Sequence, residues 1–314
     1  MLSQSYCDTI SNMIRIEKQS RVERTIIDFR VMGIDDVHVL GRYRYNYAHP
    51  RLDNHTHKGM IEIVLVDKGR QKYFVDERCY EVKGGELFVT TPDTLHSTGD
   101  SPEEKGAIYW MQVRIPPPGK CFLNLTVKQS RALAGQLLDI GTRQFKSKVD
   151  LKPLLEKIFF YHGNSDHALA SVNIGNLLTR FLLEVIDSAL NPEKHIPSEQ
   201  IHLALKEIDK NIARKIRLKN LAKKTGLSLP RFKARFKKEM GIPPAEYIQG
   251  RKIELAARLI EEKGHETITR IAFDLGYSSS QYFATVFKQY TGMTPREFRN
   301  KQNSMRTETG TRQT

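Results

Sequence analysis

The stretch IAFDLGYSSSQYFATVFKQYTGMTP, residues 271–295, decides the fold of the C-terminal third of the chain. Its first residues place apolar side chains at helical spacing and lead to Gly276, which tolerates the left-handed backbone of a tight turn. Tyr277 follows at the bend, and Ser278 or Ser279 can cap a second helix. A tight glycine turn between two short helices is typical of a helix-turn-helix unit.

The same pattern occurs about fifty residues earlier in the chain. A helix over residues 218–225 ends at Gly226, Leu227 fills the bend, and Ser228 is placed to cap the next helix. Two units in register, joined by an amphipathic helix over residues 245–263, indicate a duplicated module. Both second helices repeat phenylalanine at i and i+4, and we expect these rings to pack in the core: Phe232, Phe236, Phe283 and Phe287.

Basic charge is concentrated in the same part of the chain. The 314 residues carry 50 Lys and Arg against 36 Asp and Glu, a net charge of +14. Residues 199–314 hold 24 of these basic and 12 of these acidic side chains, whereas residues 1–198 contribute a net charge of only +2. A basic surface attracts polyanions and releases their condensed counterions on binding. Charge alone fits a solvated helical surface equally well, so it is the duplicated motif that indicates DNA.

Residues 199–300 resemble the AraC/XylS family of bacterial transcription regulators, and the second unit carries most of the family signature. The resemblance implies a seven-helix module whose two recognition helices enter successive major-groove segments on one face of the duplex, about 34 Å apart. It also implies double-stranded DNA and RNA polymerase as partners. The signature residues are Ile271-Ala272, Gly276-Tyr277, Tyr282-Phe283, Phe287-Lys288, Gly292 and Thr294-Pro295-Arg296-Glu297-Phe298-Arg299.

The resemblance places groove-facing positions on the second helix of each unit. Gln281 can pair with adenine through two hydrogen bonds, and Lys233 can donate to guanine. Pro230 and Ala234 offer no side-chain hydrogen bond, so we expect the first unit to read thymine methyl groups or DNA shape as well. For each basic residue the alternative is a solvated surface charge. The positions matched to base reading are Pro230, Lys233, Ala234, Ser280, Gln281 and Thr285, and those expected to hold phosphates are Arg231, Arg235, Lys237 and Lys288.

The N-terminal half changes from a strand pattern to a helical one. Short runs of strand-like sequence over residues 25–120 lie between Gly, Pro and Asp turns, as in a barrel or sandwich. Residues 121–190 have helical periodicity, and residues 191–198 are polar and twice interrupted by proline. The sequence therefore predicts an α+β chain of two domains. Its divisions are an N-terminal arm over 1–24, a barrel over 25–120, helices for dimerisation and coupling over 121–190, a linker over 191–198, the DNA-binding module over 199–300 and a disordered tail over 301–314.

A histidine-rich motif lies within the expected barrel. His55 and His57 share one face of an extended segment, Glu62 and Gly69 follow at fixed spacing, and a PxxxH stretch ends at His96. This HxHx4Ex6G pattern resembles the cupin barrel, here as the sensory domain of many AraC-type regulators.

Three imidazoles and one carboxylate can hold a divalent metal. The PxxxH stretch, however, lacks the usual glycine and is one residue shorter than in metal-binding cupins, so we expect an effector pocket with no metal and no cofactor. For the aromatic rings the alternative is core packing, although Trp110 could stack on a sugar ring. The residues expected to line the pocket are His55, His57, Glu62, His96, Trp110, Tyr43 and Tyr45.

Other features of the sequence narrow the class of protein. No run approaches about 18 apolar residues, the N-terminus lacks the apolar stretch of a secretory signal, and Cys7, Cys79 and Cys121 form no CxxC pair. We therefore expect a cytoplasmic, homodimeric regulator without enzymatic activity that responds to a small molecule. By analogy the effector is a sugar and the chain activates a catabolic operon. The alternatives are a metal-dependent cupin enzyme fused to a DNA-binding module, and an architectural DNA-bending protein without an effector.

Overall fold

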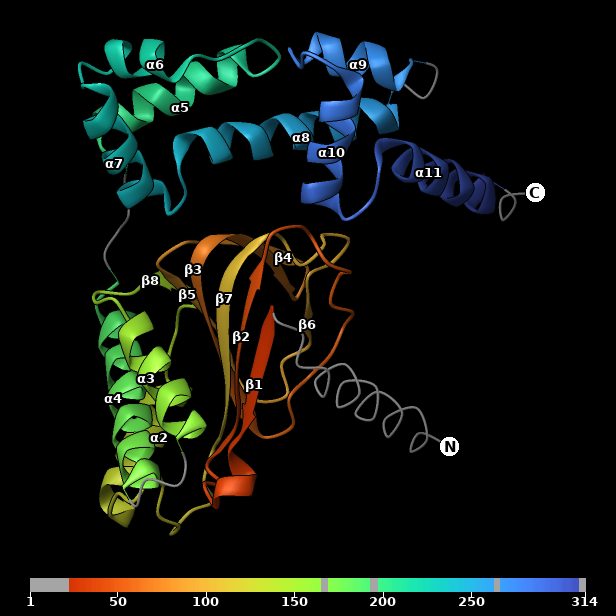
Figure 1. Cartoon of the computed structure of the whole chain (residues 1–314). Coiled ribbons are helices and arrows are strands. Elements are labelled where there is room, and N and C mark those ends of the chain that lie inside the picture. Colours follow the sequence, from red (N-terminus) through yellow and green to blue (C-terminus); the bar gives the residue numbers. More distant parts are fainter. Residues whose placement is uncertain (1–22, 165–168, 193–196, 263–265, 311–314) are drawn as a thin grey trace.

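The computed structural model describes residues 23–164, 169–192, 197–262 and 266–310, with side chains as far as Ser304. Figure 1 shows a curled sheet with helices packed along one side and an all-helical module across one end. This is the α+β chain of two domains that the sequence predicts. Of the expected N-terminal arm, residues 1–22 lie outside the described residues, and of the expected linker, residues 193–196 do. Within the described part, no helix is long and apolar enough to cross a membrane.

The sheet of the N-terminal domain is antiparallel throughout. Its strand order is β1-β2-β7-β3-β5-β8, with β4 and β6 also paired to β3. The long strand β3 pairs with β7 and β5 through its first half, and with β4 and β6 through its second half, so the sheet closes on itself. The bounds are β1 Arg24–Asp28, β2 Val37–Tyr45, β3 Met60–Val75, β4 Arg78–Lys83, β5 Glu86–Thr90, β6 His96–Ser97, β7 Gly106–Arg114 and β8 Gln144–Lys146, with a 3-10 turn η1 at Phe29–Met32.

Strand β7 is covered on both faces, which explains its uninterrupted apolar run. Tyr109 and Met111 lie in a core shared with the helices on the outside of the sheet. Ile108 and Trp110 lie in a second core inside the barrel. Because successive side chains of a strand point to opposite faces, one strand supplies both cores.

Three helices pack on the outer face of the sheet: α2 (Val127–Leu138), α3 (Lys152–Gly163) and α4 (Ala170–Leu190). The segment that we expected to be wholly helical also contains strand β8, whose Phe145 lies opposite Leu87 of β5. Phe145 is buried in the same core as the helices. A strand of three residues has no detectable periodicity, and burial of this ring at the sheet edge is what orders it.

The C-terminal module has one hydrophobic core for each helix-turn-helix unit. The paired phenylalanines are fully buried in these cores, as predicted. Helix α8 connects the two units and contributes to both cores. In the described part of the module the helices are α5 Glu199–Asn211, α6 Leu218–Lys224, α7 Leu229–Met240, α8 Pro244–Glu262, α9 Ile268–Asp274, α10 Ser280–Thr291 and α11 Pro295–Gly310.

The turns and caps of the module follow the sequence pattern with two differences. Gly226 and Gly276 have φ of 71° and 75°, the left-handed backbone that each tight turn requires. Ser279 accepts a hydrogen bond from the Tyr282 amide, whereas Ser228 occupies the equivalent cap position without a side-chain hydrogen bond.

The second difference is at the C-terminus. Helix α11 continues ten residues beyond Asn300 to Gly310, where we expected disorder. Thr294 and Glu297 form reciprocal capping hydrogen bonds that start the helix, and Gln302 donates to Glu261 of α8. The helix begins at this cap, and a hydrogen bond from its polar extension ties it to α8.

Candidate functional site

The base-reading positions expected in the first unit lie on the solvent side of α7. Phe232 and Phe236 anchor the helix in its core, and the opposite face exposes Pro230, Lys233 and Ala234. This division follows from helical spacing, because residues three or four apart share a face. All three side chains are exposed, although Ala234 also lines a cleft that faces the N-terminal domain.

The second unit presents its expected readers in the same way on α10. Gln281 and Thr285 are exposed, and Ser280 is half-buried. The Thr285 hydroxyl donates to the Gln281 carbonyl at 3.1 Å, and Ser280 Oγ lies 3.4 Å from Gln281 Oε1. A base contact by either hydroxyl therefore has to replace or share an existing contact, whereas the Gln281 amide can turn outward.

The four residues expected to hold phosphates are also exposed. Arg235 Nε lies 3.9 Å from a Glu239 oxygen, a weak contact for a surface pair. Lys237 and Ala234 line a cleft of about 570 Å³ whose other wall is the segment Lys146–Lys152 of the N-terminal domain. The first unit thus faces the N-terminal domain along part of α7. The four residues are Arg231, Arg235, Lys237 and Lys288.

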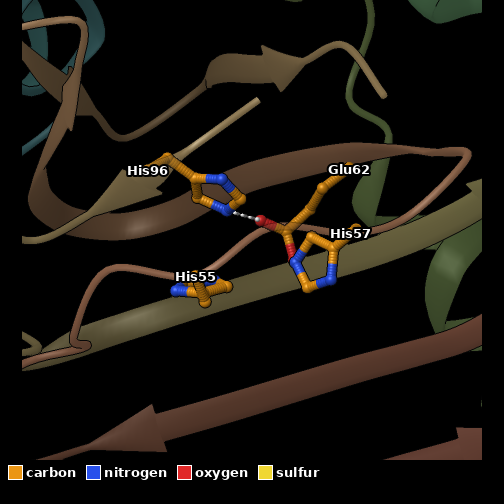
Figure 2. Close-up of side chains that lie close together, drawn as sticks. All are labelled: His55, His57, Glu62 and His96. Atoms are coloured by element: carbon orange, nitrogen blue, oxygen red, sulfur yellow. Dashed lines mark hydrogen bonds and ion pairs between the residues drawn. The ribbon is translucent and has the colours of Figure 1, made fainter. Parts of the chain in front are cut away.

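Inside the barrel the histidine-rich motif closes into a compact cluster (Figure 2). Glu62 Oε1 lies 3.2 Å from His57 Nε2, and Glu62 Oε2 lies 3.1 Å from His96 Nε2. His55 joins through a ring centroid 4.2 Å from that of His96. One ligand atom from each of the four residues lies within 4.8 Å of the others. The shorter PxxxH spacing therefore does not keep His96 away from the other three.

Backbone carbonyls fix the orientation of two of these imidazoles. His55 Nδ1 lies 2.7 Å from the Asp53 carbonyl, and His96 Nδ1 lies 2.9 Å from the Thr94 carbonyl. A carbonyl can only accept, so each Nδ1 carries a proton and each Nε2 is turned toward the cluster. This is the arrangement that orients imidazoles toward a metal ion.

The charges within the cluster are coupled. Burial acts to raise the pKa of Glu62, but the charges and hydrogen bonds of His57 and His96 hold that pKa well below its usual range. Burial acts to lower the pKa of His96, and Glu62 outweighs it, so the pKa of His96 is raised. Burial also lowers the pKa of His55. The raised pKa of His96 favours a proton on its Nε2, which lies 3.1 Å from a Glu62 oxygen.

A divalent cation could take the place of that proton. Three nitrogen donors and one carboxylate suit Zn, Mn, Fe or Ni, and the second-sphere carbonyls already hold two of the rings. The residues present therefore fit a metal ion. They also satisfy one another without one, as a hydrogen-bonded polar cluster.

The cluster forms one end of a barrel cavity of about 50 Å³. Trp110 and Tyr43 line it, as expected from the sequence, together with His55, Glu62 and His96. The Trp110 indole lies across Gly41, where a Cβ would come within 2.0 Å of the ring. Glycine at this position is therefore what lets the indole lie flat inside the barrel.

Two expected lining residues lie elsewhere. Tyr45 is buried between Tyr43 and His49, with ring centroids 4.0 and 3.7 Å away, and so packs beside the cavity. His57 belongs to the cluster but is covered by Gln112, whose Nε2 lies 3.4 Å from His57 Nε2. Neither residue forms part of the cavity wall; each contacts a residue that does.

Sequence reasoning missed several residues of the cavity wall. Gln112 could have been found, because it lies two positions after Trp110 on the same face of β7. The Glu103 carboxylate lies 3.6 Å from Arg24 NH1, and burial raises its pKa to about 7. Nothing in the polar stretch around Glu103 signals that position. The missed residues are Arg24, Leu52, Val64, Tyr73, Glu103, Ile108 and Gln112.

Comparison with known proteins covers both domains. Residues 221–301 match the model of a helix-turn-helix domain, and residues 38–140 match that of an AraC-like ligand binding domain. The probable transcriptional regulator LumQ of Photobacterium leiognathi is 28% identical over 242 residues, covering 77% of this chain and 90% of that protein. The HTH-type transcriptional activator RhaS of Escherichia coli is 23% identical over 246 residues, covering 77% of this chain and 86% of that protein.

Among solved structures, the C-terminal domain of AraT, a response regulator from Geobacillus stearothermophilus, is 26% identical. It covers 33% of this chain and 87% of that one, with a TM-score of 0.32. The two domain matches, the full-length relatives and the duplicated helix-turn-helix fold agree with one another. The chain therefore belongs to the AraC-type transcription regulators, with an AraC-like ligand-binding domain followed by a helix-turn-helix DNA-binding domain.

Proposed function

We propose that this regulator activates transcription from a promoter whose DNA it reads with α7 and α10, and that a small molecule bound in the barrel controls this activity. The exposure of the base-reading positions on both helices is the observation that carries the proposal. The chain acts without catalysis, as a homodimer joined through α2, α3 and α4, and recruits RNA polymerase. Similarity to a transcriptional activator supports the sign of regulation.

DNA reading divides into two tasks. Gln281 and Lys233 supply hydrogen bonds to base edges, while Pro230 and Ala234 contact thymine methyl groups or follow groove shape. Arg231, Arg235, Lys237 and Lys288 hold phosphates and set the register without specifying sequence. The net charge of +12 over residues 199–314 supports this assignment of the module to DNA.

The barrel cavity supports a small polar effector. An indole face, a buried carboxylate on Glu103 and the Arg24 guanidinium suit hydroxyl groups, and a sugar from a catabolic substrate fits this chemistry. The present volume of about 50 Å³ is smaller than the roughly 300 Å³ of typical ligand pockets. Sugar binding therefore requires the cavity to widen. An effector that binds the open and closed arrangements with different affinity then shifts the population between them.

The histidine cluster supports a second candidate, a divalent cation as effector or structural ion. The observation in its favour is the convergence of four donors with two imidazoles already oriented by carbonyls. Elemental analysis of the purified chain, with and without EDTA, tests it. About one equivalent of metal per chain, a melting temperature lowered by EDTA, and loss of both in His57→Ala would support the cation. A metal-free chain whose melting temperature is unchanged by added Zn, Mn, Fe or Ni would exclude it.

Selection from a random duplex library tests the DNA-binding proposal. The full chain should enrich a motif with two elements whose centres are about 10–10.5 base pairs apart. Failure to enrich any sequence would contradict the proposal. A thermal-shift screen of sugars tests the effector, because a ligand at 100 times its Kd stabilises the folded chain by about 2.7 kcal/mol.

A further inference from the structure

The segment Glu103-Glu104-Lys105 lies between the barrel cavity and the DNA-binding module. The Glu103 side chain lines the cavity, 3.6 Å from Arg24 NH1. The next two side chains instead meet the helical module, Glu104 through Arg70 and Lys105 directly. Of these three consecutive residues, the first thus faces the barrel cavity and the next two face the DNA-binding module.

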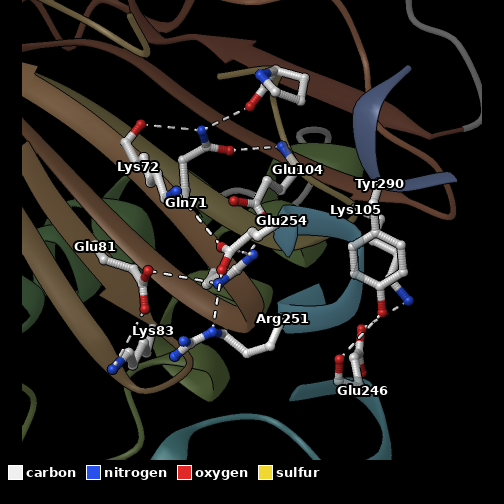
Figure 3. Close-up of polar contacts among 12 residues, drawn as sticks. Gln71, Lys72, Glu81, Lys83, Glu104, Lys105, Glu246, Arg251, Glu254 and Tyr290 are labelled. Atoms are coloured by element: carbon white, nitrogen blue, oxygen red, sulfur yellow. Dashed lines mark hydrogen bonds and ion pairs between the residues drawn. The ribbon is translucent and has the colours of Figure 1, made fainter. Parts of the chain in front are cut away.

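Arg70 of β3 links Glu104 to helix α8. Its Nε lies 3.0 Å from Glu104 Oε2, and its Nη2 lies 2.7 Å from Glu254 Oε1. Lys72 lies 3.6 Å from the same Glu254 oxygen. Arg70 is only 9% exposed, so this guanidinium depends on its carboxylate partners. Figure 3 shows Glu104 and Glu254 converging at this point, with Arg251 of α8 alongside.

Lys105 makes a second link to the module. Its Nζ lies 3.0 Å from Glu246 Oε1 of α8 and 4.5 Å from the centre of the Tyr290 ring of α10 (Figure 3). The Tyr290 hydroxyl in turn donates to the Glu246 carbonyl at 3.4 Å. One side chain of the segment therefore contacts both the connecting helix and the second recognition helix.

The backbone of the segment is tied to the same interface. The Glu103 carbonyl accepts from the His49 amide at 2.9 Å, and the neighbouring Ala48 amide donates to the Gln289 carbonyl of α10 at 2.8 Å. The Glu104 amide donates to Gln71 Oε1 at 2.8 Å. Hydrogen bonds of the segment thus reach Gln71 of the barrel and, through His49 and Ala48, helix α10 of the other domain.

We propose that Glu103-Glu104-Lys105 is the coupling segment through which occupation of the barrel cavity alters the docking of α8 and α10. Helix α8 joins the two helix-turn-helix units and contributes to both of their cores, so a change in its docking moves α7 and α10 relative to the barrel. A ligand that engages Glu103 or displaces Arg24 moves the residues that hold α8. That an effector in the cavity triggers this change rests on the proposed function. The contacts that join Glu103-Glu104-Lys105 to α8 and α10 do not depend on it.

The Ala48 amide is a direct reporter of docking, because its acceptor is the Gln289 carbonyl in the other domain. We would measure its hydrogen exchange in the full chain by residue-resolved mass spectrometry or NMR, without DNA or effector. Gly84→Val is the reference variant, because it should separate the two domains at a point outside the cavity wall. A Cβ at Gly84 would lie 2.4 Å from the carbonyl oxygen of Gly241 in the helical module. Glu156→Gln is the matched control, a carboxylate paired with Arg42 and Arg44 on the outer face of the barrel.

Glu103→Ala should raise the Ala48 exchange rate at least about tenfold, toward the rate of Gly84→Val, while Glu156→Gln leaves it unchanged. Glu103→Gln keeps the side-chain shape and serves as the second variant if the alanine variant does not fold; it should raise the rate in the same direction. An Ala48 rate within about twofold of wild type in the Glu103 variants would overturn the coupling. An unchanged rate in Gly84→Val would overturn the docked arrangement itself. Neither result depends on whether the chain binds a sugar or an operator, so failure of the proposed function remains distinguishable.

Discussion

Replacing Gln281 by alanine tests the assignment of base reading to α10. Gln281 is exposed in the first turn of the helix, and the carbonyl that Thr285 contacts belongs to its backbone, which the substitution keeps. Alanine is a strong helix former, so the free energy of unfolding should change little. The effect therefore falls on DNA contacts. A bidentate pair with adenine is worth about 1–3 kcal/mol, which corresponds to a factor of roughly 5–150 in Kd.

The assay is fluorescence anisotropy with the duplex that the wild-type chain selects, and with duplexes changed at one position each. Gln281→Ala should lose affinity for the selected duplex and become indifferent to the base at one or two positions. Gln289→Ala, exposed in the last turn of the same helix, is the matched control and should bind as the wild type does. Equal loss of affinity on every duplex, or no loss at all, would refute the assignment.

Three further predictions follow from the same structure. Arg235→Ala should weaken binding to all duplexes alike and lower the slope of log Kd against log salt by about one. Titrations at several salt concentrations would measure this slope. A change in base preference would argue against a phosphate contact. His55→Ala combined with His57→Ala should abolish any melting-temperature response to sugars or divalent ions, yet leave DNA affinity intact in gel shifts, because each domain has its own cores. Glu62→Gln should cost stability mainly between pH 4.5 and 6.5, in urea unfolding across pH. Because the pKa of Glu62 is lowered in the folded chain, the stabilisation from its ionised form is fully present above the unfolded pKa of 4.5. Because the pKa of His96 is raised in the folded chain, the stabilisation from its protonated form is fully present below the unfolded pKa of 6.5 and is lost as pH rises through the folded pKa. A difference from wild type that is constant from pH 4 to 9 would contradict this ion pair.

The helix-turn-helix units could be predicted because their signals are local. Gly226 and Gly276 need the left-handed backbone, and the phenylalanine spacing defines the buried face within one helix. The histidine cluster was predictable for a related reason, since two of its members are two residues apart on one segment. Its closure with His96 still needed the pairing of β6 with β3, which sequence spacing does not specify.

The rest of the cavity and the domain interface depend on long-range packing. Glu103 and Arg24 meet inside the barrel although almost eighty residues separate them. In the sequence Arg70 resembles any other basic residue of a strand, and only the fold places Glu254 of α8 2.7 Å from it. Strand β8 was missed because three residues carry no periodicity, and its order comes from burial of one ring against the sheet edge. Such features are properties of tertiary contacts and leave no pattern in neighbouring residues.

Hydroxyl-radical footprinting of the isolated module, residues 197–310, on the selected duplex tests the central claim most directly. The module contains both hydrophobic cores of its helices, so it should fold without the barrel, and as a single copy it avoids footprints from a second protomer. Two recognition helices predict two protected segments on one face of the duplex, with centres about 10–10.5 base pairs apart. A single protected segment, or two on opposite faces of the duplex, would contradict the claim that α7 and α10 read successive turns of the major groove.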